Sequence, residues 1–70
     1  MMPLTMLNAG ETNTIKRLGG KEETKRFLEN LGFVVGGNVT VVSDTGGNLI
    51  VNVKDSRVAI GRDMANKIMV

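Results

Sequence analysis

Several residue types that small proteins use to reinforce their folds are missing from this chain. It has no cysteine and no histidine, so a disulfide and a zinc site of the usual ligand types are both excluded. Tryptophan and tyrosine are absent too, which leaves Phe27 and Phe33 as the only aromatic residues. The core is therefore expected to consist of valine, isoleucine, leucine and methionine, with both phenylalanines buried in it.

Long apolar runs are also missing, so no segment is expected to span a bilayer. The N-terminus lacks the basic start and the apolar stretch of a secretory signal, which makes the cytoplasm the expected location. The formal net charge of +2 gives only a weak attraction to anions. With 70 residues, 41% hydrophobic and 23% charged, the composition predicts one small globular domain over residues 1–70.

A short helix followed at once by a strand is the most informative pattern in the chain. The helix is expected over residues 21–31, and its apolar face is formed at three- and four-residue spacing by Thr24, Phe27, Leu28 and Leu31. Gly32 follows as the left-handed residue that ends a helix. Phe33 then falls where it can pack back on Leu28, as in a Schellman cap. This junction is expected to fix the angle between the helix and the sheet that it covers.

Most of the remaining chain consists of short segments rich in β-branched residues. An extended N-terminus is expected at residues 2–7, and strands at residues 12–18, 38–43, 49–54, 57–61 and 67–70. Asp55 and Ser56 predict a two-residue turn, and residues 62–66 predict a single helical turn with Asp63 as its N-cap. Many short strands around one core predict a mainly β fold with a short helical insertion, closed or nearly closed as a small barrel.

Three spaced patterns cover nearly the whole chain. They are carried by Leu4, Leu7 and Gly10; by Arg26, Leu28, Leu31, Gly32, Phe33 and Gly36; and by Ala59, Ile60, Arg62, Ala65, Ile68 and Val70. In this order, the three patterns make the chain resemble the ferrous iron transport protein A family, FeoA. The resemblance implies an SH3-like β-barrel with a helical insertion. The family commonly has glycine in the turn before the fifth strand, where this chain has Asp55 and Ser56.

The resemblance also implies a function. It points to a cytoplasmic accessory protein of bacterial ferrous iron uptake that contacts the membrane transporter FeoB, with the cytoplasmic GTP-binding domain of FeoB as the expected contact. The predicted docking surface consists of Lys25, Arg26, Glu29, Phe33, Val34, Val35 and Met64. In this interpretation Met64 and Val35 belong to an adaptable apolar patch that contacts the partner protein. The chain itself is expected at the membrane only through that partner.

Residues suited to catalysis are scarce. Without histidine and cysteine, the usual bases and nucleophiles reduce to Ser43, Ser56, the threonines, the lysines and scattered carboxylates. Neither serine lies in a Gly-x-Ser-x-Gly context. The chain is therefore not expected to be an enzyme, and no cofactor or metal is expected.

Two other functions remain open. A nucleic-acid-binding small β-barrel is the main alternative, because basic residues gather at Lys16, Arg17, Lys21, Lys25 and Arg26. Glu22, Glu23 and Glu29 interrupt that cluster, and Lys25 can pair with Glu29 one turn away, so a solvated face of mixed charge is preferred and no nucleic acid is expected. The other alternative is direct regulation by iron at a weak carboxylate site.

Overall fold

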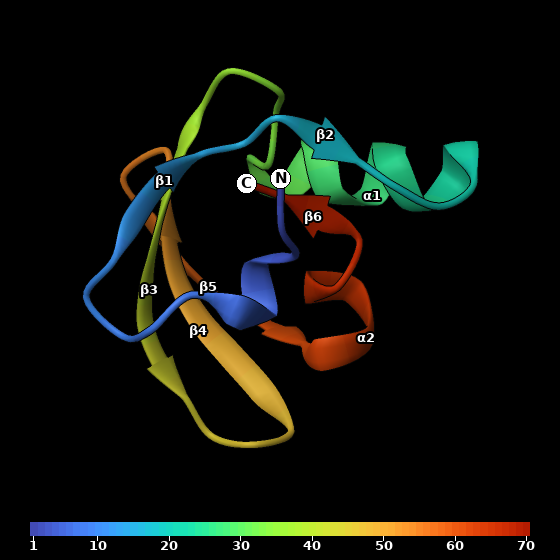
Figure 1. Cartoon of the computed structure of the whole chain (residues 1–70). Coiled ribbons are helices and arrows are strands. Elements are labelled where there is room, and N and C mark those ends of the chain that lie inside the picture. Colours follow the sequence, from blue (N-terminus) through green and yellow to red (C-terminus); the bar gives the residue numbers. More distant parts are fainter.

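The computed structural model describes all 70 residues, and it is mainly β with one inserted helix. In chain order the elements are a 3-10 turn η1 (Leu4–Met6), β1 (Thr12–Thr14), β2 (Arg17–Leu18), α1 (Glu22–Leu31), β3 (Asn38–Asp44), β4 (Asn48–Val53), β5 (Ser56–Gly61), α2 (Arg62–Ala65) and β6 (Ile68–Met69). Figure 1 shows α1 projecting to one side of the strands, next to β2 and β6. The predicted fold class is confirmed.

All strand pairs are antiparallel, and they form two sheets instead of one closed ladder. The larger sheet has the order β1-β3-β4-β5, and the smaller one pairs β2 with β6. The strand predicted at residues 12–18 is therefore divided between two sheets. The N–H of Ile15 still donates to the carbonyl of Gly37, whereas the N–H of the next residue, Lys16, donates to the carbonyl of Met69. The chain thus changes sheets between these two residues, and the barrel is open.

The N-terminus was predicted to be extended throughout, and this is wrong for its second half. Met2 exchanges hydrogen bonds of 2.9 and 2.8 Å with Val70, and Pro3 forms a β-bridge with Met69. The chain then turns into η1, because Leu4 and Leu7 both point into the core and a 3-10 turn brings residues three apart onto one side. The N-terminal segment therefore flanks β6, opposite β2.

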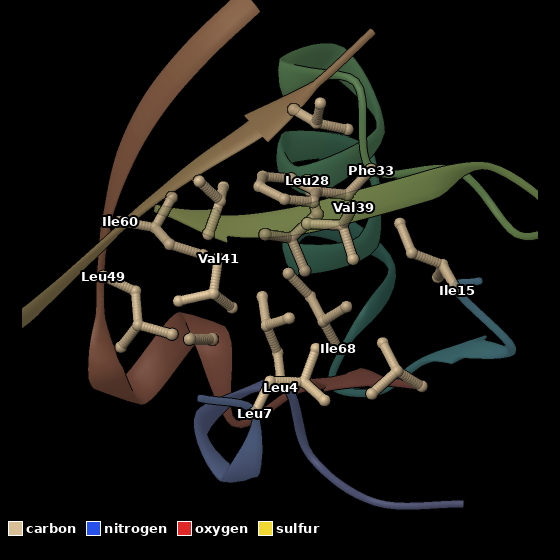
Figure 2. Packing of buried hydrophobic residues seen from close by; sticks show 14 of the residues in the cluster. Leu4, Leu7, Ile15, Leu28, Phe33, Val39, Val41, Leu49, Ile60 and Ile68 are labelled. Carbon is tan, nitrogen blue, oxygen red and sulfur yellow. The ribbon is translucent and has the colours of Figure 1, made fainter. Parts of the chain in front are cut away.

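One apolar core holds both sheets together, and it contains no buried polar or charged residue. Its members are Leu4, Leu7, Ile15, Leu18, Leu28, Phe33, Val39, Val41, Leu49, Val51, Val53, Ile60, Ala65, Ile68 and Val70. Figure 2 shows most of these side chains converging from β3, β4, β5, β6, η1 and α1. The alternation predicted for the two central strands is confirmed, with Leu49, Val51 and Val53 buried and Asn52 exposed between them.

The junction between α1 and the sheet is the predicted Schellman motif. Gly32 has φ +110°, its N–H donates to the carbonyl of Glu29, and the N–H of Phe33 donates to the carbonyl of Leu28. Leu28 and Phe33 are both fully buried in the same cluster, beside Val39 in Figure 2. The helix end is therefore tied to the core through both backbone and side chains.

Two local predictions need correction. The turn between β4 and β5 consists of Lys54 and Asp55, both with positive φ, instead of Asp55 and Ser56. A two-residue hairpin of this type matches the twist of the strands, and that requirement shifts the turn by one residue. Asp63 is not the N-cap of α2, because the helix begins one residue after Gly61 and Asp63 lies in its first turn.

Candidate functional site

Helix α1 is attached to the core through very few side chains. Leu28 is its only buried residue, while Leu31 is half-buried and packs against the core. Lys25, Arg26 and Glu29 make no side-chain hydrogen bond and no ion pair, and the expected pairing of Lys25 with Glu29 does not form. The only ion pair in the structure joins Arg62 to Asp44. The charged side chains of α1 are thus free to meet a partner.

Phe27 was expected in the core, and this prediction is wrong: 48% of it is exposed. Residues of a helix are offset by 100° per position, so Phe27 lies about 100° around the axis from the buried Leu28. The body of the protein covers only the sector around Leu28, which leaves Phe27 at the uncovered margin of the apolar face. The apolar face predicted for α1, from Phe27 to Leu28 and Leu31, is wider than one small sheet can cover. That width was the signal in the sequence that one of its members would stay exposed.

The loop between α1 and β3 has one buried and one strongly exposed apolar residue. Phe33 is fully buried, so its side chain cannot contribute to the docking surface on which it was expected. Val34 is half-buried and Val35 is 62% exposed. The N–H of Gly36 donates to the carbonyl of Ile15 over 2.8 Å, which anchors this loop where the chain changes sheets. Val35 is therefore presented to solvent from a fixed support.

Met64 lies on α2, half-buried and packed against the core. Figure 1 places α2 and the loop that precedes β3 at well-separated ends of the molecule. The structure therefore does not bring Met64 together with Val35, and the single apolar patch predicted for these residues is not formed. Lys25, Arg26 and Glu29 lie on α1, Val35 lies in the loop that follows it, and Met64 stands apart on α2.

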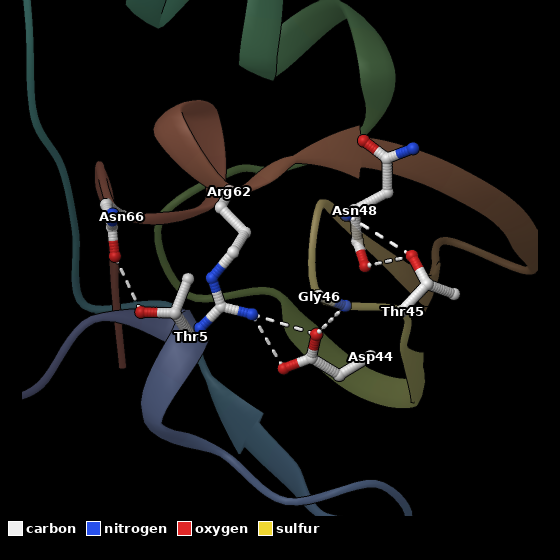
Figure 3. A network of polar contacts seen from close by, with 7 residues as sticks. All are labelled: Thr5, Asp44, Thr45, Gly46, Asn48, Arg62 and Asn66. Carbon is white, nitrogen blue, oxygen red and sulfur yellow. Dashed lines mark hydrogen bonds and ion pairs between the residues drawn. The ribbon is translucent and has the colours of Figure 1, made fainter.

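A network of polar contacts at the opposite end of the fold fixes α2 against the loop between β3 and β4. Arg62 Nη1 donates to both carboxylate oxygens of Asp44 at 2.8 Å, and the N–H of Gly46 donates to Asp44 Oδ1 (Figure 3). The hydrogen bond from Arg62 lowers the pKa of Asp44 most, and the hydrogen bond from Gly46 lowers it further. Burial acts in the opposite direction and raises the pKa slightly. Thr5 Oγ1 donates to Asn66 Oδ1 over 2.6 Å and ties α2 to η1. This network holds α2, η1 and the loop between β3 and β4 together.

The structure has one open groove, of about 500 Å³, where the end of α1 meets the outer face of the large sheet. Asn38, Thr40, Asn52, Lys54 and Asp55 line it, and Val53 is its only apolar residue. Thr40 exchanges a 2.7 Å hydrogen bond with Thr12, and Asn52 accepts a weak one from Arg57. Most of the polar groups in this groove are thus shared with neighbouring strands, and the groove is unsuited to an apolar ligand.

Clustered metal ligands and membrane-spanning helices are both missing. No three histidine, cysteine, aspartate or glutamate residues come close enough to hold an ion. No helix combines the length and the apolar character needed to cross a bilayer.

The arrangement of strands and helices assigns this protein to a structural class. Two small antiparallel sheets around one apolar core, with a helix inserted after the second strand, describe a small SH3-like domain. The model of the FeoA domain matches residues 2–70, and this protein therefore belongs to the FeoA family, which is linked to ferrous iron transport.

Individual relatives agree with this assignment. The protein named "Putative Fe(2+) transport protein A" of Methanocaldococcus jannaschii is 33% identical over all 70 residues, which cover 85% of its length. Two crystal structures of FeoA proteins superpose closely. One, an iron uptake regulatory protein, has a TM-score of 0.88 at 25% identity over 97% of this chain and 90% of its own. The other, zinc-complexed FeoA of Stenotrophomonas maltophilia, is described as an SH3 domain protein and has a TM-score of 0.83 at 27% identity over 99% of this chain and 88% of its own.

Proposed function

We propose that this protein is a cytoplasmic accessory factor of ferrous iron uptake that acts by binding the membrane transporter FeoB, and that it does so without catalysing a reaction itself. Membership of the FeoA family supports the link to ferrous iron. A role in activating ferrous iron transport has been suggested for the S. maltophilia relative, and the proposal extends that role to this chain. The cytoplasmic GTP-binding domain of FeoB is the proposed contact.

The exposed face of α1 is the observation that carries the proposal. It presents the exposed Arg26, Phe27 and Glu29 together with the half-buried Lys25, which we call the α1 surface. The three charged side chains have no partner within the chain, and Phe27 adds an exposed aromatic ring at the margin of the apolar face. Aromatic and arginine side chains are the residue types that contribute most to protein interfaces. Such a surface fits a protein partner better than a small molecule.

The loop after α1 extends this surface. Val34 and Val35 follow the helix after only two residues, and the backbone hydrogen bond between Gly36 and Ile15 holds their loop in place. A rigid loop loses little conformational entropy on binding, so an exposed valine there can contribute its apolar area in full. Met64 on α2 is a separate, second contact in this proposal.

Binding of the cytoplasmic portion of FeoB, measured by calorimetry, tests the α1 surface. The double variant Lys25→Glu, Arg26→Glu is expected to weaken binding by about tenfold or more, because it reverses two unpaired charges at the contact. Arg57→Glu reverses one exposed charge on β5, outside α1, and is the control for the single variant Arg26→Glu, whose residue is exposed as well. Equal affinity of the natural chain and all these variants, together with unchanged iron uptake in cells, rejects this surface.

A further inference from the structure

The outer edge of β5 is open. β5 is the last strand of the larger sheet, and its six residues pair only with β4. Of the hydrogen bonds made outside regular pairing, none involves a backbone group of Arg57, Val58 or Ala59. Both other candidates for a free edge, β1 and β2, are three and two residues long. β5 is therefore the longest unpaired strand edge in the molecule.

The register of the hairpin shows which groups point outward. Val53 and Ser56 close the two-residue turn, so they form a hydrogen-bonded pair and every second pair along the ladder does the same. The N–H of Arg62 donates to the carbonyl of Gly47, which continues this alternation beyond the strand. The intervening residues Arg57 and Ala59 must then direct both their N–H and C=O groups away from β4. Gly61 directs its N–H outward, whereas its C=O is the N-cap acceptor of α2.

This edge has few of the features that usually prevent strand addition. Natural edge strands are kept apart by proline, bulges, lysines or short length. β5 contains no proline, its pairing with β4 is regular over all six residues, and Arg57 is its only charge. Ala59 at its centre is exposed and too small to obstruct an incoming strand.

We propose that the edge of β5 pairs with β5 of a second copy of this chain, antiparallel and with Ala59 on the two-fold axis. In this register Ala59 faces Ala59, and Arg57 faces Gly61 of the other copy. The N–H and C=O groups of Ala59 then pair across the axis, and the N–H of Gly61 meets the C=O of Arg57 of the other copy, because residues of the same parity meet. On the inner face Val58 meets Ile60, which extends the apolar row of each core across the axis.

Charge favours this register over its neighbour. With Ala59 on the axis, the two copies of Arg57 lie at opposite ends of the paired segment and both face a glycine. A shift that places Val58 on the axis sets Arg57 against Ala59 and brings the two arginines into diagonal contact, where like charges repel. The charge on Arg57 therefore disfavours the register with Val58 on the axis.

The interface is small, so the dimer is expected to be weak. A single strand pair lies below the size of a standard protein interface. Sedimentation velocity should therefore show mainly monomer in dilute solution and a clear dimer fraction at about 1 mM chain. A strictly monomeric protein at that concentration overturns the proposal.

A charge exchange at the axis distinguishes self-pairing from any other association. Ala59→Lys and Ala59→Glu each place two like charges opposite one another, and each variant alone is expected to lose the dimer. An equal mixture of the two should dimerise at least as well as the natural chain, because opposite charges then meet. Ala9→Lys adds the same charge at an exposed turn and should leave the dimer intact.

Thermal unfolding verifies that each variant is folded. If the mixture fails to associate, or if Ala59→Lys dimerises like the natural chain, association does not use this edge and the proposal is wrong. The result is independent of FeoB binding, since β5 does not belong to the α1 surface.

Discussion

The backbone N–H of Phe33 donates to the carbonyl oxygen of Leu28 over 2.9 Å, and both side chains are fully buried. This hydrogen bond closes the C-terminal cap of α1 and directs the following chain toward β3. It also explains how a helix with one buried residue keeps a defined position. The side chains that we propose for docking are placed by this joint between α1 and the core.

Gly32→Ala should lower the free energy of unfolding by about 1–2 kcal/mol, the cost of a left-handed conformation for a residue with a Cβ. Space is not the cause, because a Cβ at Gly32 would only touch Val53 at an ordinary 3.5 Å. Urea denaturation measures the change. Gly47→Ala is the matched control, since Gly47 lacks positive φ and has nothing within 4 Å of the added methyl group. Equal effects at the two glycines would contradict the role of the cap.

Leu28→Ala and Phe27→Ala should separate stability from binding. Removing the fully buried Leu28 is expected to cost about 2–5 kcal/mol, enough to unfold much of so small a domain, whereas Phe27→Ala should cost well under half as much. Chemical denaturation of both variants tests this order. In the calorimetric assay with FeoB, Phe27→Ala should bind more weakly although it is folded. A Phe27→Ala variant as unstable as Leu28→Ala would place that ring in the core.

Asp55→Gly should stabilise the protein. Lys54 and Asp55 have φ of 47° and 63°, so two residues with side chains occupy a turn that favours glycine. Relief of that conformation is expected to add about 0.5–1 kcal/mol, which raises the melting temperature by a few degrees in a domain of this size. Differential scanning calorimetry measures the shift. Asp55→Ala keeps the side-chain restriction, loses the charge as glycine does, and should not raise the melting temperature.

Stability should depend on pH through Asp44. Hydrogen bonds from Arg62 and Gly46 lower its pKa in the folded protein, so the ionised form stabilises the fold above the unfolded pKa near 4 and this contribution disappears as pH falls through the lower folded pKa. Asp44→Asn keeps an acceptor but not the charge. Its melting temperature should lie slightly below that of the natural chain at pH 7, and the difference should vanish in strong acid and shrink in 1 M salt. A difference that grows on acidification would contradict this assignment.

Most residues of the three spaced patterns that resemble the FeoA family have a structural role in the core, and few of them lie on the proposed docking surface. Leu4, Leu7, Leu28 and Phe33 are core residues, and so are Ala65, Ile68 and Val70 at the end of the chain. Arg62 is held by its ion pair with Asp44. Arg26 is the charged member of these patterns that has no structural partner. The sequence could therefore indicate the family and the fold, whereas the docking residues stay a prediction, and the structure shows only that Phe33 among them is buried.

What the sequence determined by itself is local. Gly32 ends the helix because only glycine adopts φ +110° without strain, and alternating Val39, Val41, Leu49 and Val51 fix the buried face of two central strands. Only the tertiary structure divides residues 12–18 between two sheets, since their partners come from residues 38–40 and 68–69. It also decides that Phe27 faces water, that Phe33 does not, and that the edge of β5 stays open. The exposure of each of these groups depends on how much of its surface is covered by segments that are distant in the sequence. The local pattern of residues does not contain that information.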